Sequence, residues 1–122
     1  MVEIRREDFS IDEIIKKMKQ PNIGALSIYL GTVREFAEGV GLEFEKGSQA
    51  IQKLEEIEKR AIHIFDVEDV AIIHRVGFLG ISENILLVAV SASHRGPAFD
   101  ACRSIIDEIK DFHKSWGKEV PK

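Results

Sequence analysis

The chain has 122 residues, a length typical of one domain with a single core. Hydrophobic residues make up 44% of it and charged residues 31%, which excludes a disordered or collagen-like chain, and no run of 18 apolar residues predicts a membrane span. The net charge of −4 argues against a general nucleic-acid binder, and the single cysteine excludes an internal disulfide. The first residues lack the apolar stretch of a signal peptide. We therefore expect one cytoplasmic domain over residues 1–122.

Hydrophobic periodicity and turn residues predict a mixed set of helices and strands. In chain order the expected elements are strand 2–5, helix 11–19, strand 24–30, strand 42–45, helix 49–65, strands 69–76, 78–81 and 85–91, and helix 97–112. Residues 31–41 are rich in glycine and predict a flexible loop, and residues 113–122 predict an irregular basic tail. Ser10 and Ser48 are expected to cap their helices, and Pro97 suits a first helical position. Because the strands cluster instead of alternating with helices, the order favours an α+β sheet with helices on one face.

Residues 93–97, Ser-His-Arg-Gly-Pro, lie between an apolar strand and a helix start. Free backbone N–H groups and the helix dipole favour an anion at such a position. Arg95 adds a fixed charge with bidentate donors, and His94 can exchange protons near neutral pH. The segment predicts a phosphate or carboxylate site. The alternative is a helix-entry turn whose histidine and arginine simply face water.

The last predicted helix has a polar stripe. Arg103, Asp107, Lys110 and Lys114 follow one another at helical spacing, and Lys118 extends the basic patch. The stripe is either a cationic surface for an anionic ligand or acidic partner tail, or an ordinary solvated face.

The length of that helix separates two of these features. Pro97 and Lys110 are 13 steps apart, which is about 20 Å along a straight helix. His94 and Arg95 therefore cannot easily contact the same small ligand as Lys110 within one chain. If all of them serve one site, they come from two copies, which predicts a homodimer with composite sites.

A further candidate is the run Gly31-Thr32-Val33-Arg34, where a strand leads into a glycine and an arginine that can face an oxyanion. It lacks the Gly-Lys-Ser/Thr of a nucleotide P-loop. The sequence contains no pair of His or Cys residues at the spacing of metal ligands, so it does not predict a metal site. His74 is expected to be structural, His113 to be isolated and Cys102 to pack in the core.

Several motifs together carry a resemblance to a known family. They are Gly24-Ala25, Gly31-Thr32-Val33-Arg34, Ile73-His74-Arg75-Val76-Gly77, the string SASHRGPAFDAC at 91–102, Ile106-Asp107, Lys110 and Trp116-Gly117-Lys118-Glu119. Over about residues 5–119 the chain resembles the large, catalytic subunit of molybdopterin synthase. It departs from the family pattern at Gly117, where a lysine is usual, and in the segment 44–47, where the family is richer in aromatic residues.

The resemblance implies an α/β-hammerhead fold, with a mixed, mostly antiparallel sheet and helices packed on it. It also implies a central homodimer that binds a small ubiquitin-like sulfur-carrier subunit with a Gly-Gly C-terminus at each end, giving a heterotetramer. The implied reaction moves sulfur from the carrier's thiocarboxylate to cyclic pyranopterin monophosphate and forms the dithiolene of molybdopterin. It implies no metal and no cofactor besides this substrate.

The family's substrate-contacting positions are implied to fall here on Thr32, Val33, Arg34, His94, Arg95, Lys110, Gly117, Lys118 and Glu119. Of these, Lys110, Lys118 and His94 are the implied catalytic groups. Arg34 and Arg95 would hold the phosphate, Lys110 would lie beside the partner's terminal acyl group, and His94 would carry a proton. Restoring the usual lysine with Gly117→Lys is expected to raise turnover.

Two alternatives to this enzyme remain open at this point. One is a non-catalytic paralogue that dimerises and binds the small subunit without turnover. The other is a domain that binds a phosphometabolite and has no protein partner.

Overall fold

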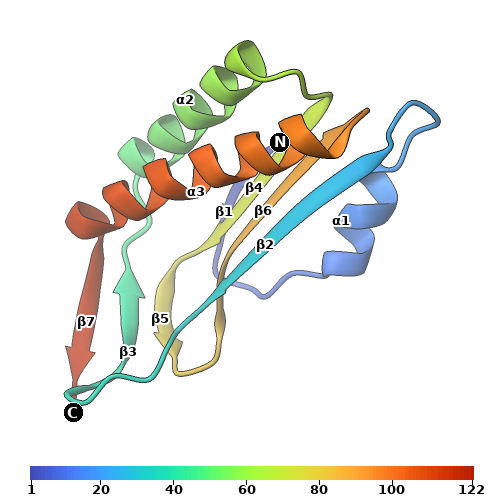
Figure 1. Cartoon of the computed structure of the whole chain (residues 1–122). Helices are drawn as coiled ribbons and strands as arrows, with labels where there is room; N and C mark the ends of the chain where they lie inside the picture. The colour runs from blue at the N-terminus through green and yellow to red at the C-terminus, as the bar shows by residue number, and fades with distance from the viewer.

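The computed structural model describes residues 1–122, which form helices and strands arranged as in Figure 1. The elements are β1 (Val2–Arg5), α1 (Ile11–Met18), β2 (Ala25–Thr32), β3 (Gly39–Phe44), α2 (Ser48–Ile64), β4 (Asp69–Arg75), β5 (Gly77–Gly80), β6 (Asn84–Ala92), α3 (Arg95–Trp116) and β7 (Gly117–Pro121). None of the helices combines the length and the apolar character needed to cross a membrane.

The strands form two sheets. The larger has the order β1-β4-β6-β2, in which only β1 and β4 run parallel. The smaller has the order β5-β3-β7 and is antiparallel throughout. It lies below the C-terminal end of α3 in Figure 1. The predicted α+β fold with a mixed, mostly antiparallel sheet is confirmed.

Helices cover both faces of the large sheet. Val70 and Ile72 of β4 face the main core under α2 and α3, whereas Ala71 and Ile73 pack with Ile14 of α1 on the other side. Figure 1 shows α1 on the side of the sheet opposite to α2 and α3. The expectation of helices on one face was therefore wrong. The inner strand β4 has apolar residues at successive positions, and a strand with apolar side chains on both faces needs cover on both.

Two segments that were expected to be irregular are structured. The helix α3 continues to Trp116 and leads directly into β7, which pairs with β3. The indole N–H of Trp116 donates to the carbonyl of Glu45 at 2.8 Å and holds this corner. Because β7 depends on pairing with a segment far away in the chain, its basic composition gave no sign of a strand. The expected loop 31–41 is likewise shortened by β2 and β3.

The helix starts are capped in different ways. The Ser10 hydroxyl accepts a hydrogen bond from a backbone N–H in the first turn of α1 at 3.3 Å, as expected. Ser48 is the first residue of α2, and the cap is Gly47, so the predicted cap is one residue off. The last helix begins at Arg95, which makes Pro97 its third residue. A proline is still tolerated there because the first turn has no partner for its N–H groups.

Candidate active site

A pocket of about 800 Å³ opens where β2 leaves the large sheet. Its lining comes from the end of β2 and the following loop, from β3, from the β5–β6 turn, from α3 and from β7. The lining residues are Tyr29, Leu30, Gly31, Thr32, Val33, Arg34, Glu35, Phe36, Leu42, Ile81, Ser82, Lys110 and Glu119. Five of the predicted site residues meet here although they belong to three distant segments: Thr32, Val33, Arg34, Lys110 and Glu119.

The first of these segments is shaped by an irregularity in β2. Its register against β6 shifts between Gly31 and Thr32, which bends the strand away from its neighbour. Val33 is then 2% exposed and is held by its backbone: its N–H donates to the carbonyl of Glu83 at 3.0 Å, and its carbonyl accepts from the N–H of Ser82 at 2.8 Å. Thr32 and Arg34 on either side of Val33 are exposed at the pocket.

Lys110 and Glu119 bring opposite charges to the pocket. Lys110 is exposed next to the fully buried Ile109, so the packing of α3 directs it outward. Its ammonium lies 5.7 Å from the centre of the Tyr29 ring, a cation–π distance. Glu119 is opposite Leu42 in the β3–β7 pair and shares its side of the small sheet. The pocket can thus hold an anion and also contains a carboxylate.

Lys118 and Gly117 are placed differently from Glu119. Side chains alternate along β7, so Lys118 points to the other face of the small sheet, where its ammonium lies 3.8 Å from the carboxylate of Glu45. It is absent from the pocket lining, whose only lysine is Lys110. Gly117 is paired with Phe44, and a Cβ at this position would lie 2.7 Å from an atom of the Phe44 ring.

This contact gives a different expectation for Gly117→Lys than the resemblance did. The Phe44 ring is 2% exposed and packs against the rings of His74, His113 and Trp116, so it has little room to move. We expect the substitution to lower the free energy of unfolding by about 1–3 kcal/mol, as overpacking does, without raising turnover. Urea unfolding and initial rates measure the two effects.

The companion variants for this substitution separate steric overlap from charge. Gly47→Lys places the same side chain where a Cβ meets nothing within 4 Å, and it should be much less destabilising. In a Phe44→Leu background the additional loss caused by Gly117→Lys should shrink, because the ring is gone. An unchanged stability of Gly117→Lys together with faster turnover would support the original expectation instead.

His94 and Arg95 lie at the other end of α3. Both are exposed, and His94 is the helix cap but makes no side-chain capping hydrogen bond. Neither lines the pocket that contains Lys110. The unbroken helix between them confirms the separation expected from the sequence, so one chain does not unite all the predicted site residues.

The buried His74 and the half-buried His113 form a pair beneath the small sheet. The Nδ1 of the fully buried His74 lies 2.6 Å from the carbonyl of Arg75, and its Nε2 lies 2.8 Å from the Nε2 of His113. Because a carbonyl only accepts, Nδ1 of His74 carries the proton, and His113 donates to the bare Nε2. His74 is structural, as expected, but His113 is not isolated. No group of residues in the structure has the arrangement of a metal site.

This pair makes stability depend on pH. Burial lowers the pKa of His74 to about 3, and burial together with the charge of Lys110 lowers that of His113 to about 4. Unfolded histidines take up protons near pH 6.5, whereas the folded pair does not, so the free energy of unfolding falls as the pH drops below 6.5. For His74 the loss by pH 5 is about 2 kcal/mol. Urea unfolding at a series of pH values measures it.

A matched pair of variants tests whether the His74–His113 pair causes this pH dependence. His113→Gln retains a donor to His74 and removes one titrating ring, so the dependence between pH 6.5 and 5 should become shallower. His63→Gln removes an exposed histidine and should leave the pH dependence of the free energy of unfolding unchanged. Parallel curves for wild type and His113→Gln would contradict the assignment.

Part of the pocket lining was not recognisable from the sequence. Tyr29, Ile81 and Ser82 carry no motif that marks them as site residues, and Ile81 and Ser82 reach the pocket through the folding of the β5–β6 turn against Val33. Tyr29 carries the one usable signal, since it alternates with the apolar residues of its strand.

Comparison with known proteins supports the resemblance. The family model described as "MoaE protein" matches residues 4–112. The chain is 40% identical to the molybdopterin synthase catalytic subunit of Pyrococcus abyssi, over 93% of this chain and 80% of that protein. Among solved structures, a molybdopterin synthase from Staphylococcus aureus superposes with a TM-score of 0.85 at 30% identity, covering 98% of this chain and 90% of that one. The molybdopterin cofactor biosynthesis protein E from Burkholderia multivorans gives 0.82 at 35% identity, covering 89% and 75%.

Proposed function

The chain belongs to the family of large, catalytic subunits of molybdopterin synthase, and from this premise we propose that its pocket is where sulfur is transferred to cyclic pyranopterin monophosphate. The protein is thus an enzyme of molybdenum cofactor biosynthesis, and the non-catalytic alternative is not favoured. The observation that carries the site is the meeting of Thr32–Arg34, Lys110 and Glu119 around one cavity.

The roles of these residues follow from their chemistry. Arg34 offers a bidentate cation to the substrate phosphate. Lys110 is placed to polarise the carbonyl of the partner's terminal thiocarboxylate, or to capture its acyl group as a nucleophile. Glu119 supplies a counter-charge that orients cationic groups in the pocket. The proposal needs no resident cofactor and no metal.

His94 and Arg95 complete the site when a second copy donates them. The start of β2 adjoins the start of α3, since Gly24 N–H donates to the carbonyl of Ala92 at 3.0 Å, and the end of β2 adjoins Lys110. The strand and the helix therefore run side by side in the same direction. A two-fold axis that pairs β2 with its counterpart in antiparallel fashion would place the partner's helix start beside this chain's pocket.

The edge formed by β2 suits such a pairing. The strand has a neighbour on one side only, β6, so its other edge has unpaired backbone groups. Ile28 and Leu30 are each 38% exposed along it, and Phe99 of α3 is 61% exposed nearby, beside a groove that Ile28 also lines. Burial of this apolar edge by a second copy would stabilise the dimer and create two composite sites.

The remaining partner is the small ubiquitin-like subunit. We propose that the Gly-Gly tail of this subunit enters the pocket of each protomer, giving a heterotetramer with one carrier at each end. We also propose that the reaction takes place in the cytoplasm, on the premise that the pterin phosphate is made there, because a charged phosphate ester does not cross a bilayer unaided and must be used in the compartment where it forms.

Reconstitution tests this function. The purified chain is combined with a thiocarboxylated small subunit and cyclic pyranopterin monophosphate, and the dithiolene product is measured by mass spectrometry. Product formation is the expected result. Binding of the small subunit without any product would support the non-catalytic paralogue, and binding of the pterin phosphate without binding of the small subunit would support a phosphometabolite-binding domain.

A further inference from the structure

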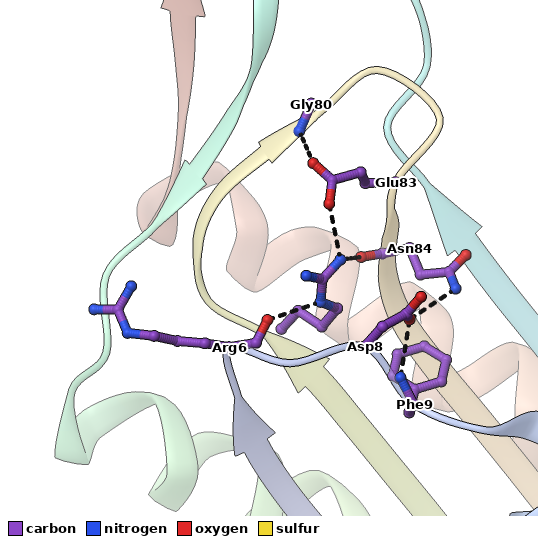
Figure 2. A network of polar contacts seen from close by, with 7 residues as sticks. Arg6, Asp8, Phe9, Gly80, Glu83 and Asn84 are labelled. Carbon is purple, nitrogen blue, oxygen red and sulfur yellow. Dashed lines mark hydrogen bonds and ion pairs between the residues drawn. The ribbon is translucent and has the colours of Figure 1, made fainter.

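A hydrogen-bond network behind the pocket is centred on Arg75, the last residue of β4. This side chain is only 11% exposed. Its Nε donates to the carbonyl of Arg6 at 3.0 Å, and its Nη1 donates to the carbonyl of Asn84 at 3.1 Å and to the carboxylate of Glu83 at 3.4 Å. Figure 2 shows the network, which ties the segment after β1 and the start of β6 to the end of β4. None of these four residues lines the pocket.

Glu83 closes the turn between β5 and β6. Its carboxylate accepts from the N–H of Gly80 at 2.6 Å (Figure 2). Its own N–H donates to the carbonyl of Gly80 at 3.0 Å. Between them Ser82 has a φ of +73°, a left-handed conformation that costs a non-glycine residue about 1–2 kcal/mol. The turn therefore needs outside contacts to keep this shape, and the clamp between Arg75 and Glu83 supplies one of them, beside the backbone hydrogen bonds to Val33.

The clamped turn is bonded directly to the pocket. Ser82 N–H donates to the carbonyl of Val33, and Val33 N–H donates to the carbonyl of Glu83, so both backbone groups of Val33 are held by the turn. Thr32 and Arg34 extend from this fixed point into the pocket. A shift of the turn would move Val33 and, with it, the direction of the Arg34 side chain.

We propose that Arg75 and Glu83 are positioning residues for the pocket: by clamping the β5–β6 turn they hold Val33, and thereby orient Thr32 and Arg34 toward the substrate phosphate. The role in substrate binding rests on the proposed function of the pocket. The role in holding Val33 does not, because it concerns this chain alone. Both residues act through others, so they should affect substrate binding more than the chemical step.

Amide hydrogen exchange tests the clamp without any substrate. Glu83→Ala should speed the exchange of the Val33 and Ser82 amides at least about tenfold relative to wild type, because the turn that protects them loses its tie. Glu83→Gln retains one oxygen, which can accept from Gly80 or from Arg75 but not from both, so its exchange rates should lie between those of wild type and Glu83→Ala. Glu108→Ala, which removes the partner of Arg60 in a similar ion pair between α2 and α3, should leave both amides unchanged. Unchanged exchange in Glu83→Ala would overturn the clamp.

Kinetics in the reconstituted system test the link to the substrate. Glu83→Ala should raise KM for cyclic pyranopterin monophosphate about tenfold and change kcat less than about threefold, since one misdirected charge-assisted contact is worth about a factor of ten. Glu83→Gln, which keeps one of the two acceptor oxygens, should give a KM between those of wild type and Glu83→Ala. Faster exchange with unchanged KM would overturn the link to the substrate but not the clamp, whereas a wild type without activity would overturn the proposed function and leave the exchange test valid. Arg75→Lys, which retains the charge and loses the fork of donors, should give an intermediate KM, and its urea unfolding shows whether it folds.

Discussion

Replacing Lys110 with alanine is expected to slow dithiolene formation by at least about 100-fold, because the pocket then loses the cation that faces the developing negative charge. Lys110 is the only lysine that lines the pocket, and Lys118 points to the opposite side of the small sheet. No neighbouring ammonium can therefore replace it. Single-turnover rates with a preloaded small subunit measure the effect without a contribution from product release.

A conservative variant and a control sharpen this prediction. Lys110→Arg keeps the charge but is not a nucleophile at neutral pH, so substantial activity would indicate polarisation of the carbonyl, and a loss equal to that of alanine would indicate acyl capture. Lys114→Ala removes the next lysine on the same helix, which pairs with Asp111 outside the pocket, and should keep the wild-type rate. A Lys110→Ala protein as active as Lys114→Ala would contradict the assigned role.

Mixing two inactive variants is expected to restore activity. In a composite site Lys110 comes from one protomer and His94 from the other, so a mixed dimer of Lys110→Ala with His94→Ala contains one site with both changes and one intact site. With random mixing, half of the dimers are mixed and half of their sites are intact, which predicts about a quarter of the wild-type rate. The two proteins are unfolded together, refolded and assayed against each one alone.

A second mixture serves as the negative control. Lys110 and Arg34 line the same pocket of one chain, so a mixture of Lys110→Ala with Arg34→Ala contains no intact site and should stay inactive. Activity in both mixtures would point to incomplete inactivation of the single variants. If neither mixture recovers activity, although gel filtration shows dimers, His94 does not belong to the partner's pocket.

The positions of the candidate residues with local chemical signals follow largely from the sequence. His94 and Arg95 lie within two or three residues of the predicted helix start, Thr32–Arg34 lie just past the predicted end of their strand, and Lys110 faces outward from its helix as its spacing predicts. These features depend on a few neighbouring residues in the chain, because capping, alternation and helical spacing are local. The same local rules show why the length of α3 keeps its two ends apart.

The sequence by itself thus determined the types of most of the elements and the separate groups of charged residues. Only the tertiary structure decided that residues 117–121 form a strand, that Glu119 faces the pocket while Lys118 does not, and that Arg75 acts behind it. The physical reason is that these outcomes depend on how separate segments meet and in which register, as in the pairing of Leu42 with Glu119 and the hydrogen bond from Arg75 to the carbonyl of Arg6. A shift of that register by one residue would exchange the faces of Lys118 and Glu119, and no local pattern in either strand specifies which register is adopted.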